Sequence, residues 1–142
     1  MHPGIVFCAL LALAVTFAGY SDAGAASDAE RAKICDEAEK RYQELFGKPS
    51  KDEPVAIVKM YKYTFCPDVL KVKQGTTVRW VNVDKRTSHS VWFKEQGKDE
   101  SDRLFSEENV EVKMDFPPGE VDYLCGPHFE KEGMKARIFI TE

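Results

Sequence analysis

Four residues in the second half of the chain carry side chains that could bind a metal ion. Cys125, His128 and Met134 place a thiolate, an imidazole and a thioether within ten residues, and His89 stands 36 positions before the cysteine. Apart from His2, the chain has no other histidine. Two imidazoles, one thiolate and a weak, distant thioether form the ligand set of blue-copper electron-transfer sites, because this mixture suits both oxidation states of the metal. The residues therefore predict a site for one copper ion that cycles between Cu(I) and Cu(II).

Each of these residues also has an ordinary structural interpretation. His89 could be a surface residue, Met134 could fill a core, and Cys125 could be a buried thiol. A Cys-x2-His motif alone is weak, and a methionine six residues after the histidine adds little by itself. The combination of all four residues, with one histidine far away in the sequence, favours copper if the chain is an exported β-sandwich, which the patterns described below predict.

The N-terminal region predicts export. Residues 5–19 form an apolar run that is too short to span a bilayer comfortably. The small residues Ala23-Gly24-Ala25 follow as an A-x-A cleavage site. We therefore interpret residues 1–25 as a secretory signal peptide, with an uncleaved anchor as the alternative. The mature protein is expected in the periplasm and without membrane association.

The charge balance bears on the class of partner. Residues 26–142 hold 20 basic and 23 acidic residues, a net charge of −3. This mild acidity gives no support to nucleic acid as a partner. Acidic residues gather in the segment 97–111. This segment is interpreted as a solvated loop or, alternatively, as an acidic patch that steers a basic redox partner.

Three cysteines remain after residue 25. In an oxidising compartment an odd number usually means one disulfide and one thiol with another role. If Cys125 holds a metal, then Cys35 and Cys66 are the remaining pair. The alternative is that both are unpaired thiols.

Residues 26–52 are predicted to form a helical extension. Ser27 and Glu30 have the spacing of a capping box, and Gly47 followed by Pro49 provides a stop. One apolar face recurs at helical spacing in Ile34, Ala38, Tyr42 and Leu45. The helix cannot bury this face alone, so we expect it to pack on the following domain. It would either brace an open edge of that domain or dock it to a partner.

Residues 53–142 have the pattern of short strands separated by turns. The expected strands lie within 55–65, 70–75, 76–82, 89–94, 109–116, 120–125 and 134–141. In the third of these, Val78 and Trp80 share one face while Thr77 and Arg79 share the other. About seven short strands in so few residues predict a single all-β sandwich domain.

The stretch 65–142 resembles the cupredoxins, and particularly the plastocyanin, amicyanin and pseudoazurin branch. The resemblance runs through Pro67, Leu70-x-Val72-x-x-Gly75, Val78-x-Trp80-x-Asn82, His89-Ser90-Val91, Tyr123-x-Cys125-Gly-Pro127-His128 and Gly133-Met134. It implies a Greek-key sandwich of seven to eight strands and a copper ion ligated by His89, Cys125, His128 and Met134. It also implies that the edge of His128 reaches the surface within an apolar patch. Redox proteins such as a cytochrome, dehydrogenase, oxidase or reductase would dock there.

The ligand region differs from the family pattern in a few positions. Five residues separate His128 from Met134, whereas members near this branch mostly have two or four. Ser90 follows the first ligand in place of asparagine or threonine, and its hydroxyl can still bridge the two ligand loops. Pro127 has no N–H. The thiolate of Cys125 is therefore predicted to accept one backbone hydrogen bond, from the amide of Ser90.

These features favour a soluble one-electron carrier over an enzyme. Copper oxidases and reductases need further histidine clusters, which two histidines cannot supply. The alternative is a copper-handling protein, a chaperone or a store, although such proteins tend to use open sites rich in methionine and histidine. A partner-binding module docked by the N-terminal helix could coexist with electron transfer.

Overall fold

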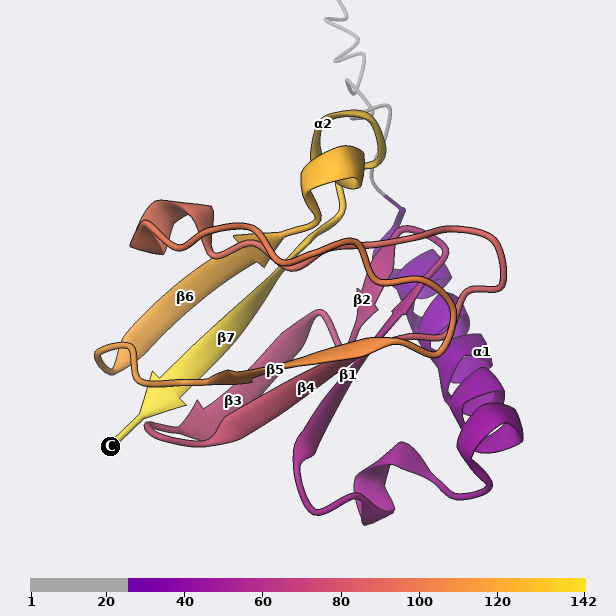
Figure 1. The fold of residues 1–142 in the computed structure, drawn as a ribbon, viewed down its shortest axis with the longest axis horizontal. Helices are drawn as coiled ribbons and strands as arrows, with labels where there is room; N and C mark the ends of the chain where they lie inside the picture. Colours follow the sequence, from indigo (N-terminus) through magenta and orange to yellow (C-terminus); the bar gives the residue numbers. More distant parts are fainter. Residues whose placement is uncertain (1–25) are drawn as a thin grey trace, which may run out of the picture.

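The computed structural model of this chain describes residues 26–142. The predicted signal peptide, residues 1–25, lies outside the described residues. The described part forms an N-terminal helix and two β-sheets with a shared core between them (Figure 1). No helix within residues 26–142 is both long enough and apolar enough to cross a membrane.

Seven strands make up the two sheets. They are β1 (Ala56–Tyr61), β2 (Thr64–Cys66), β3 (Val69–Lys73), β4 (Thr77–Asn82), β5 (Asn109–Lys113), β6 (Gly119–Leu124) and β7 (Lys135–Thr141). One sheet has the order β2-β1-β4-β5 and the other has the order β3-β7-β6. The pairs β1–β4 and β3–β7 are parallel, and the remaining neighbours are antiparallel. The predicted all-β sandwich with an N-terminal helix is confirmed.

Aromatic side chains join the two sheets. Val78 and Trp80 of β4 are fully buried, as the alternation in this strand predicts. The Trp80 ring lies edge-on to Phe93 at 5.7 Å and to Tyr123 at 5.3 Å, measured between ring centroids. Because Tyr123 belongs to β6, this packing fixes the end of β6 relative to the opposite sheet. Cys125 follows Tyr123 by two residues, so the same packing positions it.

The predicted N-terminal helix is α1 (Asp28–Phe46). Ser27 and Glu30 form the capping box at its start, and Gly47 ends it in the left-handed conformation with φ 74°. Ala38 and Tyr42 are buried in a cluster that includes Ile57 of β1. A disulfide between Cys35 and Cys66 joins the helix to β2. The helix therefore covers the outer side of the β1–β2 edge (Figure 1).

Two predicted strands differ in the structure. The segment 55–65 is divided into β1 and β2 by a turn at Lys62 and Tyr63, which both adopt positive φ. The segment 89–94 forms two isolated bridges, from His89 to Leu104 and from Trp92 to Leu124. His89 pairs with Leu104 of the same long connection, whereas Trp92 pairs with Leu124 of β6, so the two bridges do not join into a continuous ladder.

Candidate metal centre

The predicted ligands meet at one end of the sandwich. Cys125 directly follows β6, and His128 ends the short helical turn Gly126–His128. Met134 directly precedes β7. His89 comes from the long connection between β4 and β5, where its backbone pairs with Leu104 in both directions (3.0 and 2.8 Å). The ends of two adjacent strands and a bridged loop thus place the four residues together.

Three donor atoms converge in this place. The ligand atoms of His89, Cys125 and His128 all lie within 4.8 Å of one another. The Cys125 sulfur is 3.9 Å from Nδ1 of His89 and 3.3 Å from Nδ1 of His128. Nitrogen and sulfur bound to one ion at about 2.0 and 2.3 Å in a trigonal arrangement would lie about 3.7 Å apart. The observed spacing is compatible with a single ion of the size of copper.

Burial distinguishes the members of this group. His89 and Cys125 are fully buried and Met134 is 1% exposed, whereas His128 is only partly buried. The ring of Tyr63 lies edge-on to the His128 ring, with a centroid distance of 4.9 Å. Tyr63 is itself 40% exposed. His128 and Tyr63 therefore form the point where this centre meets solvent.

The five residues between His128 and Met134 are largely wound into a helix. Residues Phe129–Glu132 form α2, and Gly133 closes it with φ 63° and an N–H bond to the Phe129 carbonyl. Met134 is held on both sides by the backbone, because its N–H donates to His128 and its carbonyl accepts from Cys125. The longer spacer thus leaves Met134 beside the Cys125 backbone. Its axial role stays a prediction.

Ser90 connects the two ligand loops. Its backbone N–H donates to the Cys125 sulfur at 3.4 Å. Its hydroxyl oxygen accepts the N–H of Gly126 at 3.0 Å. The loop that carries His89 is thereby bound to the loop that carries Cys125, and Pro127 has no amide hydrogen to offer the sulfur.

Asp84 orients His89 and was not among the residues predicted from the sequence. Its carboxylate lies 2.7 Å from Nε2 of His89, opposite to the Nδ1 that faces Cys125. The backbone N–H of Lys62 also donates to this carboxylate, and the Asp84 N–H donates to the side chain of Asn82. A carboxylate on the far nitrogen of a metal-binding histidine fixes its tautomer and ring orientation. An acidic residue five positions before His89, close behind a strand, was the available signal.

The two histidines have opposite electrostatic surroundings. Burial disfavours the charged form of His89, but Asp84 and the Cys125 sulfur outweigh it and raise the pKa of His89. Burial, the neighbouring His89 and the Arg103 guanidinium lower the pKa of His128. The partly exposed His128 is therefore favoured in the neutral form that a metal requires.

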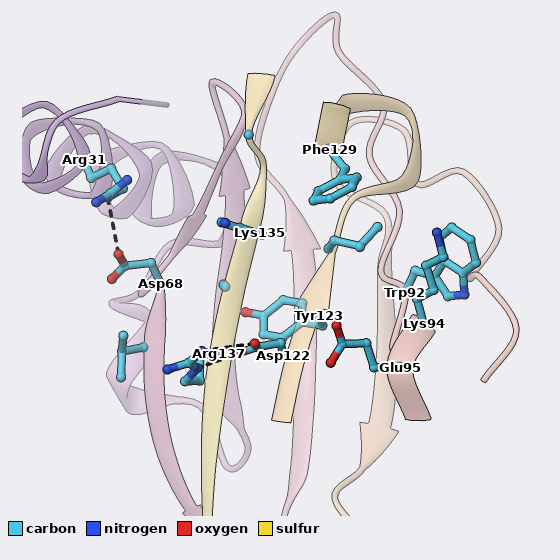
Figure 2. A pocket seen from close by; sticks show the side chains of 14 residues that line it. Arg31, Asp68, Trp92, Lys94, Glu95, Asp122, Tyr123, Phe129, Lys135 and Arg137 are labelled. Atoms are coloured by element: carbon cyan, nitrogen blue, oxygen red, sulfur yellow. Dashed lines mark hydrogen bonds and ion pairs between the residues drawn. The ribbon is translucent and has the colours of Figure 1, made fainter. Parts of the chain in front are cut away.

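A separate groove of about 440 Å³ lies along the β6 and β7 side of the molecule (Figure 2). Trp92 and Phe129 flank it, but none of the four predicted ligands lines it. Charged groups within the groove pair with each other, Arg31 with Asp68 at 3.4 Å and Arg137 with Asp122 at 2.5 Å. The metal centre is thus not the floor of this groove.

Comparison with known proteins agrees with the fold and the donor set. Residues 55–141 match the family of copper binding proteins described as the plastocyanin/azurin family. This match spans more than half of the chain, and the chain therefore belongs to that family. The family, and the three converged donors, make copper the cofactor of this fold. No curated protein sequence matches the chain.

Solved structures with the same fold include amicyanins. One from Paracoccus versutus (Thiobacillus versutus) has a TM-score of 0.54 and 23% identity, covering 65% of this chain and 88% of the amicyanin. The structure of an oxidised amicyanin mutant has a TM-score of 0.55 and 23% identity, and the match covers 63% of this chain and 85% of the amicyanin. A copper-containing nitrite reductase from Thermus scotoductus SA-01 has a TM-score of 0.53 and 29% identity, and the match covers 68% of this chain but only 24% of the reductase. The amicyanin similarity establishes the cupredoxin fold.

Proposed function

We propose that this protein is a one-electron carrier with a single type I copper ion held by His89, Cys125 and His128. Met134 would be the weak axial ligand. The observation that carries the proposal is the convergence of two imidazole nitrogens and one sulfur within 4.8 Å. Copper bound there would supply the one-electron couple.

The surrounding residues favour electron transfer because they hold the donors still. Asp84 and the two backbone bonds to Leu104 fix His89, and the bonds to Met134 fix the end of β6. Burial of Cys125 and His89 would keep water away from a metal ion bound between them. A site that is rigid and dry before the metal changes charge reorganises little, which favours fast transfer.

We infer that electrons enter and leave at the exposed edge of His128. Partners would be redox proteins such as a cytochrome, a dehydrogenase, an oxidase or a reductase. The apolar run in 5–19 supports export to the periplasm, and the Cys35–Cys66 disulfide is consistent with an oxidising compartment.

The test is the absorption spectrum of the copper-loaded mature chain. We expect an intense visible thiolate-to-copper band that ascorbate bleaches and an oxidant restores, and we expect Cys125→Ser to lose it. Ser106→Ala, at an exposed position outside the predicted ligand set, is the control and should keep the band.

Two results would contradict the carrier proposal. The first is failure to bind cupric ion, or a band that survives Cys125→Ser. The second is rapid and complete transfer of the copper to a chelator, which would favour the copper-handling alternative.

A further inference from the structure

The carboxylate of Glu100 lies against the bridge between the two ligand loops. The Ser90 hydroxyl donates to Oε1 of Glu100 at 2.5 Å and accepts the Gly126 N–H at 3.0 Å. Glu100 follows a turn in the loop after Lys94–Gln96 and is exposed on its outer side. An ionised carboxylate can only accept hydrogen bonds. The single hydroxyl proton of Ser90 is therefore directed to Glu100.

This direction matters because the thiolate is a competing acceptor. The Ser90 hydroxyl oxygen lies 3.9 Å from the Cys125 sulfur. At that distance the sulfur accepts weakly at best, whereas the bond to Glu100 is short and assisted by charge. With Glu100 absent, a small rotation would allow the same proton to point to the sulfur.

Gly126 is adapted to the same carboxylate. A Cβ at this position would overlap the Glu100 side chain, so a larger residue fits only if Glu100 moves. Gly126 has no left-handed backbone conformation that would otherwise call for glycine. The absence of a Cβ at position 126 therefore leaves room for the Glu100 carboxylate beside Ser90.

We propose that Glu100 is a positioning residue of the metal centre, which keeps the Ser90 hydroxyl proton away from the Cys125 thiolate. Hydrogen bonds to the sulfur withdraw its charge and favour the reduced metal. Glu100 thus keeps the sulfur a stronger donor and the reduction potential lower. This inference rests on the proposed copper site.

The test compares reduction potentials of copper-loaded variants. Glu100→Ala should shift the potential upward, changing the ratio of reduced to oxidised protein at a fixed electrode potential about fivefold, as for one ordinary hydrogen bond. Glu100→Gln keeps an acceptor oxygen for Ser90 and should shift it by less than half as much. In a Ser90→Ala background, Glu100→Ala should have no further effect. Asp99→Ala, which removes a neighbouring exposed charge, should leave the potential unchanged.

A second measurement needs no metal. In the copper-free protein, the hydrogen bond between the Gly126 N–H and the Ser90 hydroxyl can be followed directly. The Gly126 amide signal in NMR spectra should shift in Glu100→Ala and stay near its position in Glu100→Gln.

Several outcomes would overturn the inference. They are an unchanged potential in Glu100→Ala, an equal shift in Glu100→Gln or Asp99→Ala, and an undiminished shift in the Ser90→Ala background. A Gly126 amide signal that does not shift in Glu100→Ala would also overturn it. A wild-type protein without the visible copper band would refute the proposed function instead, and the metal-free measurement would still decide whether Glu100 holds the Ser90 bridge.

Discussion

Pro127 stands two residues after Cys125, inside the turn Gly126–His128. As a proline it cannot donate a backbone hydrogen bond to the neighbouring sulfur. The Ser90 amide, at 3.4 Å, is the backbone donor to this sulfur in the described part of the chain. The electron density on the thiolate is therefore set by very few hydrogen bonds.

Replacing Pro127 with alanine should raise the reduction potential, because a second amide could then withdraw charge from the sulfur. Cyclic voltammetry of the copper-loaded variant measures this change. Pro118→Ala, in the turn at the other end of β6, is the matched control and should leave the potential unchanged. A potential for Pro127→Ala that is unchanged or lower would contradict the account.

Asp84 would act on a metal bound at this site through the ring of His89. Asp84→Ala should lower copper affinity by about 10- to 100-fold, the usual effect of losing such an outer partner. Asp84→Asn keeps an oxygen that can accept a hydrogen bond from Nε2, so its copper affinity should fall by a smaller factor. Competition with a chelator of known affinity measures both. Equal losses in the two variants would show that the charge, rather than the orientation of the ring, is what matters.

At the scale of elements, α1 is attached to the sandwich by a covalent bond and an apolar face. Cys35 and Cys66 are 31 residues apart in the sequence. Replacing both with alanine should lower the free energy of unfolding by about 3–4 kcal/mol, from the loop-closure entropy of the unfolded chain. Urea unfolding measures this loss.

The same double variant separates a bracing helix from a docking helix. If α1 only braces the β1–β2 edge, the electron self-exchange rate and the visible band should stay at wild-type values while stability falls. A slower exchange rate with the fold intact would instead assign α1 a part in docking.

At the scale of the whole molecule, a partly buried ion pair couples stability to pH. Lys59 of β1 is 8% exposed, and its ammonium lies 2.8 Å from the Glu39 carboxylate of α1. Ser50 and Gln43 also donate to this carboxylate. Burial alone would raise the pKa of Glu39, but the hydrogen bonds from Lys59, Ser50 and Gln43 outweigh it and lower the pKa from 4.5 to about 2.

The sign of the effect follows from this lowered pKa. Glu39 stabilises the folded chain above about pH 4.5, and this contribution is lost as the pH falls from 4.5 to about 2. Glu39→Gln should therefore lower the free energy of unfolding by roughly 2 kcal/mol near neutral pH, after allowance for solvent screening. The unfolding free energy of this variant should also change less than that of the wild type as the pH falls. Urea unfolding of the copper-free protein at several pH values measures both. Asp36→Asn, on the exposed side of α1, should change neither, and parallel curves for Glu39→Gln and wild type would contradict the prediction.

The acidic segment 97–111 shows how much a charge pattern leaves open. Glu100 binds Ser90, Glu108 accepts the Phe105 N–H, and Glu111 pairs with Arg79. Half of its carboxylates therefore have partners within the chain. A count of charges in the sequence could not distinguish these intramolecular roles from a free steering surface.

The fold and the donor set were predictable because they depend on regular spacing. The alternation of Val78 and Trp80 predicts a half-buried strand, and the positions of Cys125 and His128 around a strand end predict their approach to each other. Asp84 and Glu100 were missed because carboxylates in polar loops have no period. The prediction of a strand at residues 89–94 was wrong, because a β-prone composition does not show whether successive residues pair with one neighbouring strand or with different segments.

Helix α2 keeps His128 and Met134 close together although five residues separate them in the sequence. Four extended residues would span about 13 Å, whereas one helical turn advances the chain by about 5 Å. Residues inserted as a helical turn can therefore lengthen a loop without moving the two residues at its ends apart. Loops of unequal length could in this way be exchanged between related proteins, provided that the first and last inserted residues are joined by a backbone hydrogen bond, as Phe129 and Gly133 are here.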